Sequence, residues 1–318
     1  MPSISFNVRA VSGPWGGSSP FVSQLSAYLK RLGFTVCYDL RRNIDVIFLI
    51  DPRVDQKNKR YGVSEIVAYK RSHPHIQVIH RINECDQRKG TAFMDPMLKK
   101  ANLVADFTVF ISAWLAAYHI RRWFDPAAPH CVIYNGADPA IFHPIGSQIY
   151  CDDSVFRIIT HHWSNHMLKG FDVYEQVDRL IANRRLKDVE LVIMGRYPEN
   201  IHWRNATLIP PQAAARMAGY LRSCHAYLTA SRWEPCGMHH VEGAQCGLPL
   251  LYHEDGGGIV EAGKRYGIGF THDVAGAILK MKSDWPNYRQ RVLEMMPSGQ
   301  AMCASYLSVI YRLLASET

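Results

Sequence analysis

The amino-acid sequence predicts an α/β protein built on two parallel β-sheets, and three observations point to this class. Apolar segments of strand length alternate with segments of helical periodicity in both halves of the chain. Such alternation is typical of parallel sheets that are covered by helices. Several strand-like segments are continuously apolar, as in strands buried on both faces. The length of 318 residues corresponds to about two domains of roughly 150 residues each.

The first half of the chain supplies the first sheet. Residues 3–11 alternate as a strand does, and a glycine-rich turn follows. Phe21, Leu25 and Leu29 then recur at helical spacing until Gly33, which ends the helix. Further strands are predicted at 44–50, 76–80 and 105–112, and Ser112 can cap the helix that begins after it.

The second half repeats this alternation after a polar break. Residues 145–155 are the expected linker, which divides a first domain (1–147) from a second (148–318). Strands are predicted at 156–160, 189–194, 206–210, 227–231 and 248–252, and helices at 269–285 and 306–314. Asp152 and Asp153 in the linker are the type of pair that can hold a divalent cation. They precede a strand rather than follow one, so a linker explains them better, and we expect no metal site.

Composition limits the partners and the compartment. Lysine and arginine outnumber aspartate and glutamate by 36 to 28, which favours anionic partners such as nucleoside diphosphates. The aromatic residues are dispersed rather than gathered in one basic segment, so we expect no nucleic acid. No segment is long and apolar enough to span a bilayer, and the chain does not start like a secretion signal. We expect a cytoplasmic protein; peripheral membrane contact through the basic first half stays open.

The stretch at 227–261 carries the clearest signs of chemistry. A short apolar strand leads into a loop with Glu234 and Gly237, and a helix with Glu242 follows. A helix N-terminus offers backbone N–H groups and partial positive charge to an anion, so a phosphate would bind well there. The alternative is structural. Ser231 and Glu234 fit a helix capping box, and Glu242 would then be an ordinary solvated helix residue.

Seven residues separate Glu234 from Glu242, a Gly-Leu-Pro turn follows the helix, and glycines precede Glu261. In this arrangement the stretch resembles the donor site of retaining glycosyltransferase family 4. The phrase Asn135-Gly136 and the turn Lys169-Gly170 match the family in order and spacing. The resemblance implies the GT-B fold, in which two Rossmann-like domains with parallel sheets face each other across a cleft. It also implies that the last helix, at about 303–316, crosses back to the first domain.

The resemblance assigns roles to several residues of the second domain. Lys169 would face the diphosphate of the donor, and Glu242 would accept hydrogen bonds from the ribose hydroxyls. Glu234 would hold hydroxyls of the donor sugar, with backbone amides at Gly237 and Met238 close to that sugar or its phosphate. Lys169 and Glu234, together with His80, are therefore the catalytic candidates.

The chain departs from the family at Ser164, where an arginine normally holds the diphosphate. Ser164, Asn165 and His166 can supply neutral hydrogen-bond donors there. Alternatively Arg196, which follows the strand at 189–194, supplies the missing charge.

Two features of the first domain also match the family. His80 ends the predicted strand 76–80, and family members often have a histidine close to the donor sugar at this place. A structural histidine is the alternative. Gly16 and Gly17 resemble the double-glycine loop that faces the acceptor, and a plain tight turn is the alternative reading of that pair.

The resemblance thus implies a hexosyltransferase. It would move a sugar from a nucleoside diphosphate sugar of UDP or GDP type to a hydroxyl acceptor, with retention of anomeric configuration, in glycan or glycoconjugate synthesis. The acceptor would be a glycan, a lipid-linked molecule or a small molecule. No cofactor is expected besides the nucleotide sugar, and no metal ion. The alternative is a catalytically impaired protein that still binds nucleotide sugars, for which Ser164 is the main argument.

Overall fold

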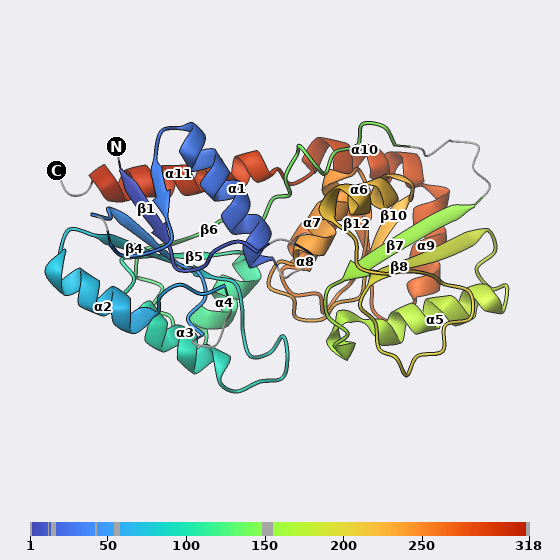
Figure 1. Ribbon diagram of the computed structural model, residues 1–318. Coiled ribbons are helices and arrows are strands. Elements are labelled where there is room, and N and C mark those ends of the chain that lie inside the picture. Colours follow the sequence, from blue (N-terminus) through green and yellow to red (C-terminus); the bar gives the residue numbers. More distant parts are fainter. Residues whose placement is uncertain are drawn as a thin grey trace. The chain divides into compact units, whose positions relative to one another are not determined.

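A computed structural model (Figure 1) describes residues 2–11, 13, 17–41, 43–53, 58–147 and 155–315. The chain forms two compact units. Unit 1 comprises Met1–Asn135 and Gly299–Thr318, and unit 2 comprises Gly136–Ser298. The first boundary therefore comes earlier than the expected division at 147/148. The expected linker lies partly outside the described residues, and Asp152 and Asp153 lie wholly outside them.

Unit 1 contains a six-stranded sheet in the order β2-β1-β3-β4-β5-β6, and all neighbouring strands are parallel. Its strands are β1 (Ser3–Phe6), β2 (Thr35–Cys37), β3 (Val46–Leu49), β4 (Gln77–Ile82), β5 (Phe107–Phe110) and β6 (His130–Val132). Strands β1, β3 and β5 are buried along their whole length. For β3 this burial matches the continuously apolar segment that predicts it, whereas β1 was predicted from alternation and is nevertheless buried on both faces.

Helices cover both faces of this sheet. They are α1 (Ser18–Arg31), α2 (Val63–Ser72), α3 (Met94–Asn102), α4 (Ala113–Ile120) and α11 (Gly299–Ala315). Helices α1 and α11 pack in one core cluster, where the ring centroids of Phe21 and Tyr306 are 5.0 Å apart, and α2 packs in another (Figure 1). The Ser112 side chain accepts a hydrogen bond from the Leu115 N–H at 3.1 Å, which confirms the expected cap of α4.

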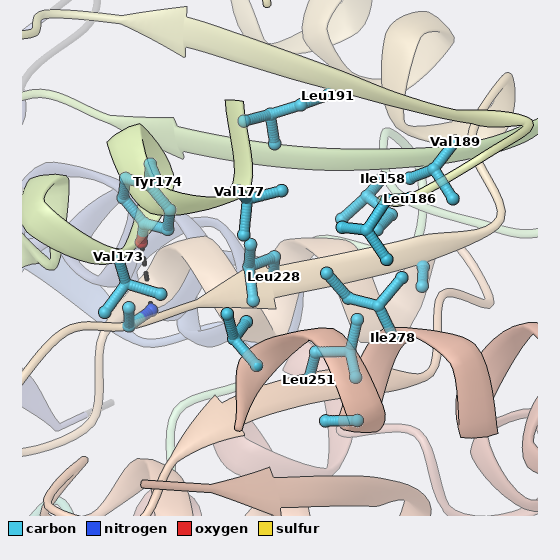
Figure 2. Close-up of a cluster of buried hydrophobic side chains, with 14 of the residues drawn as sticks. Ile158, Val173, Tyr174, Val177, Leu186, Val189, Leu191, Leu228, Leu251 and Ile278 are labelled. Atoms are coloured by element: carbon cyan, nitrogen blue, oxygen red, sulfur yellow. Dashed lines mark hydrogen bonds between the residues drawn. The ribbon is translucent and has the colours of Figure 1, made fainter. Parts of the chain in front are cut away.

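Unit 2 contains a second parallel six-stranded sheet, in the order β12-β11-β10-β7-β8-β9. The strands are β7 (Phe156–His162), β8 (Val189–Gly195), β9 (Thr207–Ile209), β10 (Ala226–Thr229), β11 (Leu250–His253) and β12 (Gly267–Phe270). The helical elements are η1 (Met167–Lys169), α5 (Phe171–Ala182), α6 (Ala214–Arg222), α7 (Met238–Gln245), α8 (Ile259–Tyr266), α9 (Val274–Ser283) and α10 (Trp285–Met295). Figure 2 shows the core in which Val177 of α5 and Ile278 of α9 meet the strands.

The edge strand β12 was not expected. The predicted helix at 269–285 begins only at Val274, and Gly267–Phe270 instead pair with β11 from Leu250 to His253. Two of the four residues of β12 are glycines, which strands normally disfavour. The segment is a strand because β11 offers it a pairing edge, which a local sequence pattern does not reveal.

Candidate functional site

The candidate site lies at the carboxyl edge of the sheet in unit 2. From β7 the chain continues to β8 on one side, whereas β10 returns to the other side of β7. The sheet therefore changes direction between β7 and β10. In open parallel sheets, ligands bind outside the carboxyl ends of strands at such a point. The segments that follow β7 and β10 carry Lys169 and Glu234.

Lys169 and Glu234 form an ion pair between Nζ and Oε2. The lysine side chain is 14% exposed and the glutamate side chain 5% exposed. A buried carboxylate is costly unless it is paired, so each group stabilises the charge of the other. The pairing contradicts the capping-box reading of Ser231 and Glu234, because no helix starts at Ser231 and the carboxylate is bound to Lys169.

Backbone contacts hold the two segments together. Arg232 N–H donates to the Leu168 carbonyl at 2.9 Å, and the Arg232 guanidinium binds both carboxylate oxygens of Asp172 at 3.0 and 2.7 Å. Gly170 has φ +91°, and a Cβ there would collide with Ala230. Glycine at this position therefore serves both the left-handed backbone and the close approach of η1 to β10.

The glycines after β11 close against the backbone of Glu234. Gly258 N–H donates to the Glu234 carbonyl at 2.9 Å. Gly257 has φ +67°, and a Cβ there would lie 2.8 Å from the same carbonyl oxygen. Helix α7 then starts at Met238 after Gly237, which has no side chain to cap it. The N-cap residue thus provides no side-chain cap for the first backbone N–H groups of α7; the anion site expected there stays a prediction.

Glu242 lies on α7 and is only 5% exposed, so the solvated-helix reading of this residue is wrong. Its Oε2 lies 2.9 Å from Nε2 of His161 at the end of β7. The Tyr227 hydroxyl, from β10, lies 3.1 Å from Nδ1 of the same imidazole. Neither His161 nor Tyr227 was predicted as a site residue. The adjacent histidines at 161 and 162 were the available signal, but only the sheet order brings them to Glu242.

Three further histidines pack near the ion pair. His162 and His239 have pKa values well below the ordinary value, mainly because burial disfavours the imidazolium. The charge of Lys169 lowers the pKa of His162 further. Burial also lowers the pKa of His240 to about 4. Within the described part of the chain, no three His, Cys, Asp or Glu side chains are grouped so as to hold a metal ion.

Ser164, Asn165 and Arg196 lie at the turn after β7 and at the end of β8. Ser164 Oγ accepts from His166 N–H at 3.3 Å, and Asn165 is exposed. Arg196 Nη1 donates to the Trp163 carbonyl at 3.2 Å, and the Arg196 backbone N–H donates to the His162 carbonyl at 2.8 Å. The Arg196 guanidinium thus lies beside the turn in which the family arginine is missing.

In unit 1, His80 does not lie where the sequence predicts it. Strand β4 continues to Ile82, so His80 is inside the strand and wholly buried. Its Nδ1 is 2.8 Å from Oδ1 of Asn102 on α3, and burial lowers its pKa to about 4. The expectation of a strand end at His80 is wrong because the apolar pattern continues past the basic side chain of Arg81, which packs over the Phe21 ring.

The carboxyl edge of this sheet instead carries two ion pairs that were not predicted. Arg53 binds Asp51 after β3, with Nε 2.9 Å from Oδ1. Arg88 Nη1 lies 2.8 Å from Oε2 of Glu84 after β4. Gly17 precedes α1 with an ordinary φ of −59°, and Gly16 lies outside the described residues.

Comparisons with known proteins agree with this fold. Residues 162–284 match the family model described as Glycosyl transferases group 1, and no curated protein matches the chain in sequence. Sucrose-phosphate synthase of Thermosynechococcus elongatus is 16% identical with a TM-score of 0.71, over 100% of both chains. Anabaena HepE with UDP and glucose is 13% identical with a TM-score of 0.67, over 98% of this chain and 100% of that one.

WaaG, a glycosyltransferase involved in lipopolysaccharide biosynthesis, is 11% identical with a TM-score of 0.68, and the match covers 97% of this chain and 99% of WaaG. At these identities the structural likeness shows the fold alone. The two six-stranded parallel sheets are the expected GT-B fold. The match of residues 162–284 confirms the resemblance to glycosyltransferases, and assignment to family 4 itself stays a prediction. None of the helices described is long and apolar enough to cross a membrane.

Proposed function

We propose that this protein, which carries a glycosyl transferases group 1 domain over residues 162–284, is a retaining glycosyltransferase. It moves a sugar from a nucleoside diphosphate sugar to a hydroxyl acceptor. The observation that carries the proposal is the buried pair of Lys169 and Glu234 at the point where the sheet of unit 2 changes direction. The pair joins the Lys169 cation to the Glu234 carboxylate, which can accept hydrogen bonds from sugar hydroxyls, beside the start of α7.

Each role follows from the charge and position of the group. Lys169 stabilises the negative charge that develops on the leaving diphosphate, as preorganised cations do in phosphate sites. The Glu234 carboxylate accepts hydrogen bonds from donor-sugar hydroxyls. Glu242 accepts them from the ribose. The N–H groups at Gly237 and Met238, where α7 begins, meet the sugar or its phosphate.

Arg196 supplies the second positive charge that Ser164 does not. Its guanidinium lies beside the turn at 163–166 and is exposed, so it can reach a diphosphate bound over that turn. Arginine binds phosphate oxygens with two parallel N–H groups. We therefore expect Arg196→Ala to weaken diphosphate binding, while Ser164 and Asn165 contribute neutral donors.

The reaction breaks the bond between the anomeric carbon and the diphosphate oxygen. A bond to the acceptor oxygen forms on the same face of the sugar. The acceptor hydroxyl proton passes to the leaving diphosphate, which needs no protein nucleophile. Lys169, Arg196 and the helix start balance the charge without a metal ion. Activity that a chelator abolishes and Mg²⁺ restores would contradict this scheme.

A second candidate function is a nucleotide-sugar-binding protein that has lost catalysis. Ser164 favours it, because one of the usual two cations is absent from that turn. The two functions differ in turnover. A binding protein would retain the donor without transferring the sugar and without hydrolysing it slowly.

The decisive experiment is a thermal-shift screen against UDP, GDP, ADP and their sugars. A ligand at 100 times its dissociation constant stabilises the folded protein by about 2.7 kcal/mol. Anabaena HepE was solved with UDP and glucose, so uridine donors are tested first. Each binding donor is then followed for transfer and for slow hydrolysis. Absence of a shift with all three nucleotides would reject both candidate functions.

A further inference from the structure

A chain of hydrogen bonds joins three elements of unit 2 behind Glu242. It runs from the Tyr227 hydroxyl on β10, through the His161 imidazole on β7, to the Glu242 carboxylate on α7. We propose that Tyr227 and His161 are positioning residues that fix the Glu242 carboxylate with one oxygen turned to the ribose of the donor. This inference rests on the proposed function and names what prepares that subsite.

The contacts of Glu242 place a proton on Nε2 of His161. An ionised carboxylate only accepts hydrogen bonds, so Nε2 donates to Oε2 of Glu242 at 2.9 Å. The Tyr227 oxygen accepts from the His161 backbone N–H at 2.9 Å. Two acceptors lie close to its O–H, which are Nδ1 of His161 at 3.1 Å and the His161 carbonyl at 3.3 Å. We assign the O–H to Nδ1, the nearer of the two, and the imidazole is then the neutral Nε2–H tautomer.

Close packing restricts the movement of these hydrogen-bonded side chains. His161 and Tyr227 are wholly buried, and their rings meet edge to face, with centroids 5.5 Å apart. Gly243, next to Glu242, lies against the Tyr227 ring, and a Cβ there would lie 2.5 Å from a ring carbon. The glycine thus lets α7 approach β10 closely enough for the tyrosine, the histidine and the glutamate to meet.

The two oxygens of the Glu242 carboxylate have different roles. Oε2 is occupied by His161, whereas Oε1 has no hydrogen-bond partner among the residues described. A carboxylate held by one oxygen cannot rotate freely, so the other oxygen presents its lone pairs in a fixed direction. Without the tyrosine hydroxyl, Nδ1 loses its hydrogen-bond donor, and the imidazole loses one of the two contacts that fix its orientation. The ring then no longer holds Oε2 in one place, so the direction of Oε1 is no longer fixed.

The test compares two tyrosines with the same local chemistry. The Tyr174 hydroxyl also contacts a buried histidine, with Nε2 of His162 at 2.8 Å. It accepts a hydrogen bond from the Ala230 backbone N–H at 3.0 Å, which is the dashed line at Tyr174 in Figure 2. It does not contact Glu242. Tyr174→Phe and Tyr227→Phe therefore remove equivalent buried hydroxyls, and only the second removal disturbs the proposed ribose contact.

Titration calorimetry gives the ratio of dissociation constants for UDP and 2′-deoxy-UDP, with GDP, ADP and their 2′-deoxy forms treated likewise. A hydrogen bond to a charged group corresponds to a preference of about 10- to 100-fold for the ribose form. We expect Tyr227→Phe, His161→Phe and Glu242→Gln each to lose most of this preference. His161→Gln, which retains an N–H donor, should recover part of it, and Tyr174→Phe should keep it. Because Tyr227 acts through Glu242, Tyr227→Phe should have no further effect in the Glu242→Gln background.

Retention of the full preference in Tyr227→Phe, or equal loss in Tyr174→Phe, would overturn the inference. So would a wild-type protein that binds the diphosphates without preferring ribose. If wild-type protein binds none of these nucleotides, the proposed function is rejected. The role of Tyr227 and His161 in positioning Glu242 is then tested by a measurement that needs no ligand. Nitrogen NMR of ¹⁵N-histidine-labelled protein, with His161 assigned by His161→Phe, should show the Nε2–H tautomer at His161 in wild type and a shift of its Nδ1 signal in Tyr227→Phe, because Nδ1 loses its hydrogen bond. Another tautomer in wild type would also overturn the inference.

Discussion

At the scale of single residues, the ion pair of Lys169 and Glu234 changes what a substitution is expected to do. The sequence suggests a lysine at a turn whose loss would affect turnover far more than stability. The structure shows that this lysine neutralises a glutamate that is only 5% exposed. Removing the cation leaves a buried carboxylate without its partner, which is strongly destabilising in proteins. Binding and folding are therefore coupled at this pair.

We expect Lys169→Met to lower the free energy of unfolding by about 3–5 kcal/mol and the transfer rate by about 100- to 1000-fold. The double variant Lys169→Met/Glu234→Gln removes the unpaired charge, so it should regain most of the stability and none of the activity. Urea denaturation and donor turnover measure the two effects separately. A double variant that is both stable and active would show that Lys169 does not face the diphosphate.

The buried histidines make the stability depend on pH. His80, His162, His239 and His240 all have lowered pKa values in the folded protein because of burial. Below the ordinary histidine pKa of about 6.5, the unfolded chain binds protons that the folded chain does not. The free energy of unfolding should therefore be highest above about pH 6.5 and decrease as the pH falls towards 4. Chemical denaturation between pH 7.5 and 5.5 measures this loss.

His240 provides a single-residue test, because it is buried and burial lowers its pKa to about 4. His240→Leu should make the loss of stability between pH 7.5 and 5.5 smaller by about 1 kcal/mol. Comparing the two pH values cancels any change in packing. Exposed His272→Leu controls for removal of a histidine as such. An unchanged loss in His240→Leu would mean that folding does not lower the pKa of His240.

At the scale of elements, helix α7 is adapted to its neighbours rather than to helix propensity. Gly243 lies inside this eight-residue helix, where alanine would ordinarily be more favourable by about 1 kcal/mol. A Cβ there would collide with the Tyr227 ring. Glycine at position 243 therefore makes the isolated helix less stable but allows α7 to pack closely against β10. That contact brings Glu242 to His161.

Two glycine-to-alanine substitutions test this interpretation. Gly219 lies inside α6, and a Cβ there would have nothing within 4 Å. Gly219→Ala should raise the free energy of unfolding by up to about 1 kcal/mol. Gly243→Ala should lower it by about 1–3 kcal/mol, as overpacking does. Thermal and urea denaturation show the signs. A stabilising Gly243→Ala would mean that Tyr227 moves without cost.

At the scale of the whole molecule, unit 1 is completed by a helix from the far end of the sequence. Tyr306 of α11 is wholly buried in the core of unit 1. Its hydroxyl accepts from Nε of buried Arg81 at 3.2 Å, and Arg81 Nη2 donates to Oδ1 of Asn135 at 2.8 Å. Helix α11 is thus part of the same folding unit as strand β1. We expect the two units to respond differently to a change in this helix.

Tyr306→Ala should destabilise unit 1 by about 3–5 kcal/mol, as deletion of a large buried ring does. Hydrogen exchange followed by mass spectrometry locates the effect. Peptides from β1, β3 and β4 should exchange faster, and peptides from β7 and β8 of unit 2 should keep their protection. Tyr306→Phe, which keeps the ring, is the matched control. Equal acceleration in both units would show that they unfold as one.

Local patterns in the sequence determined much of this molecule. The alternation of apolar strands with amphipathic helices predicted both parallel sheets, Ser112 predicted the start of α4, and the glycine before Met238 preceded α7 as expected. These features depend on periodicity, capping and backbone freedom within a few residues, so they can be recognised from neighbouring positions alone. The family resemblance added the order of the motifs along the chain.

Tertiary structure alone decided which of these residues meet. Lys169 and Glu234 are 65 positions apart and His161 and Glu242 are 81 apart, and both pairs depend on β10 lying beside β7. The same non-local pairing made Gly267–Phe270 an edge strand, and the extended β4 buried His80. The physical reason is that burial and hydrogen-bond partners are set by sheet order and packing between distant segments. Propensity and periodicity act only within a segment.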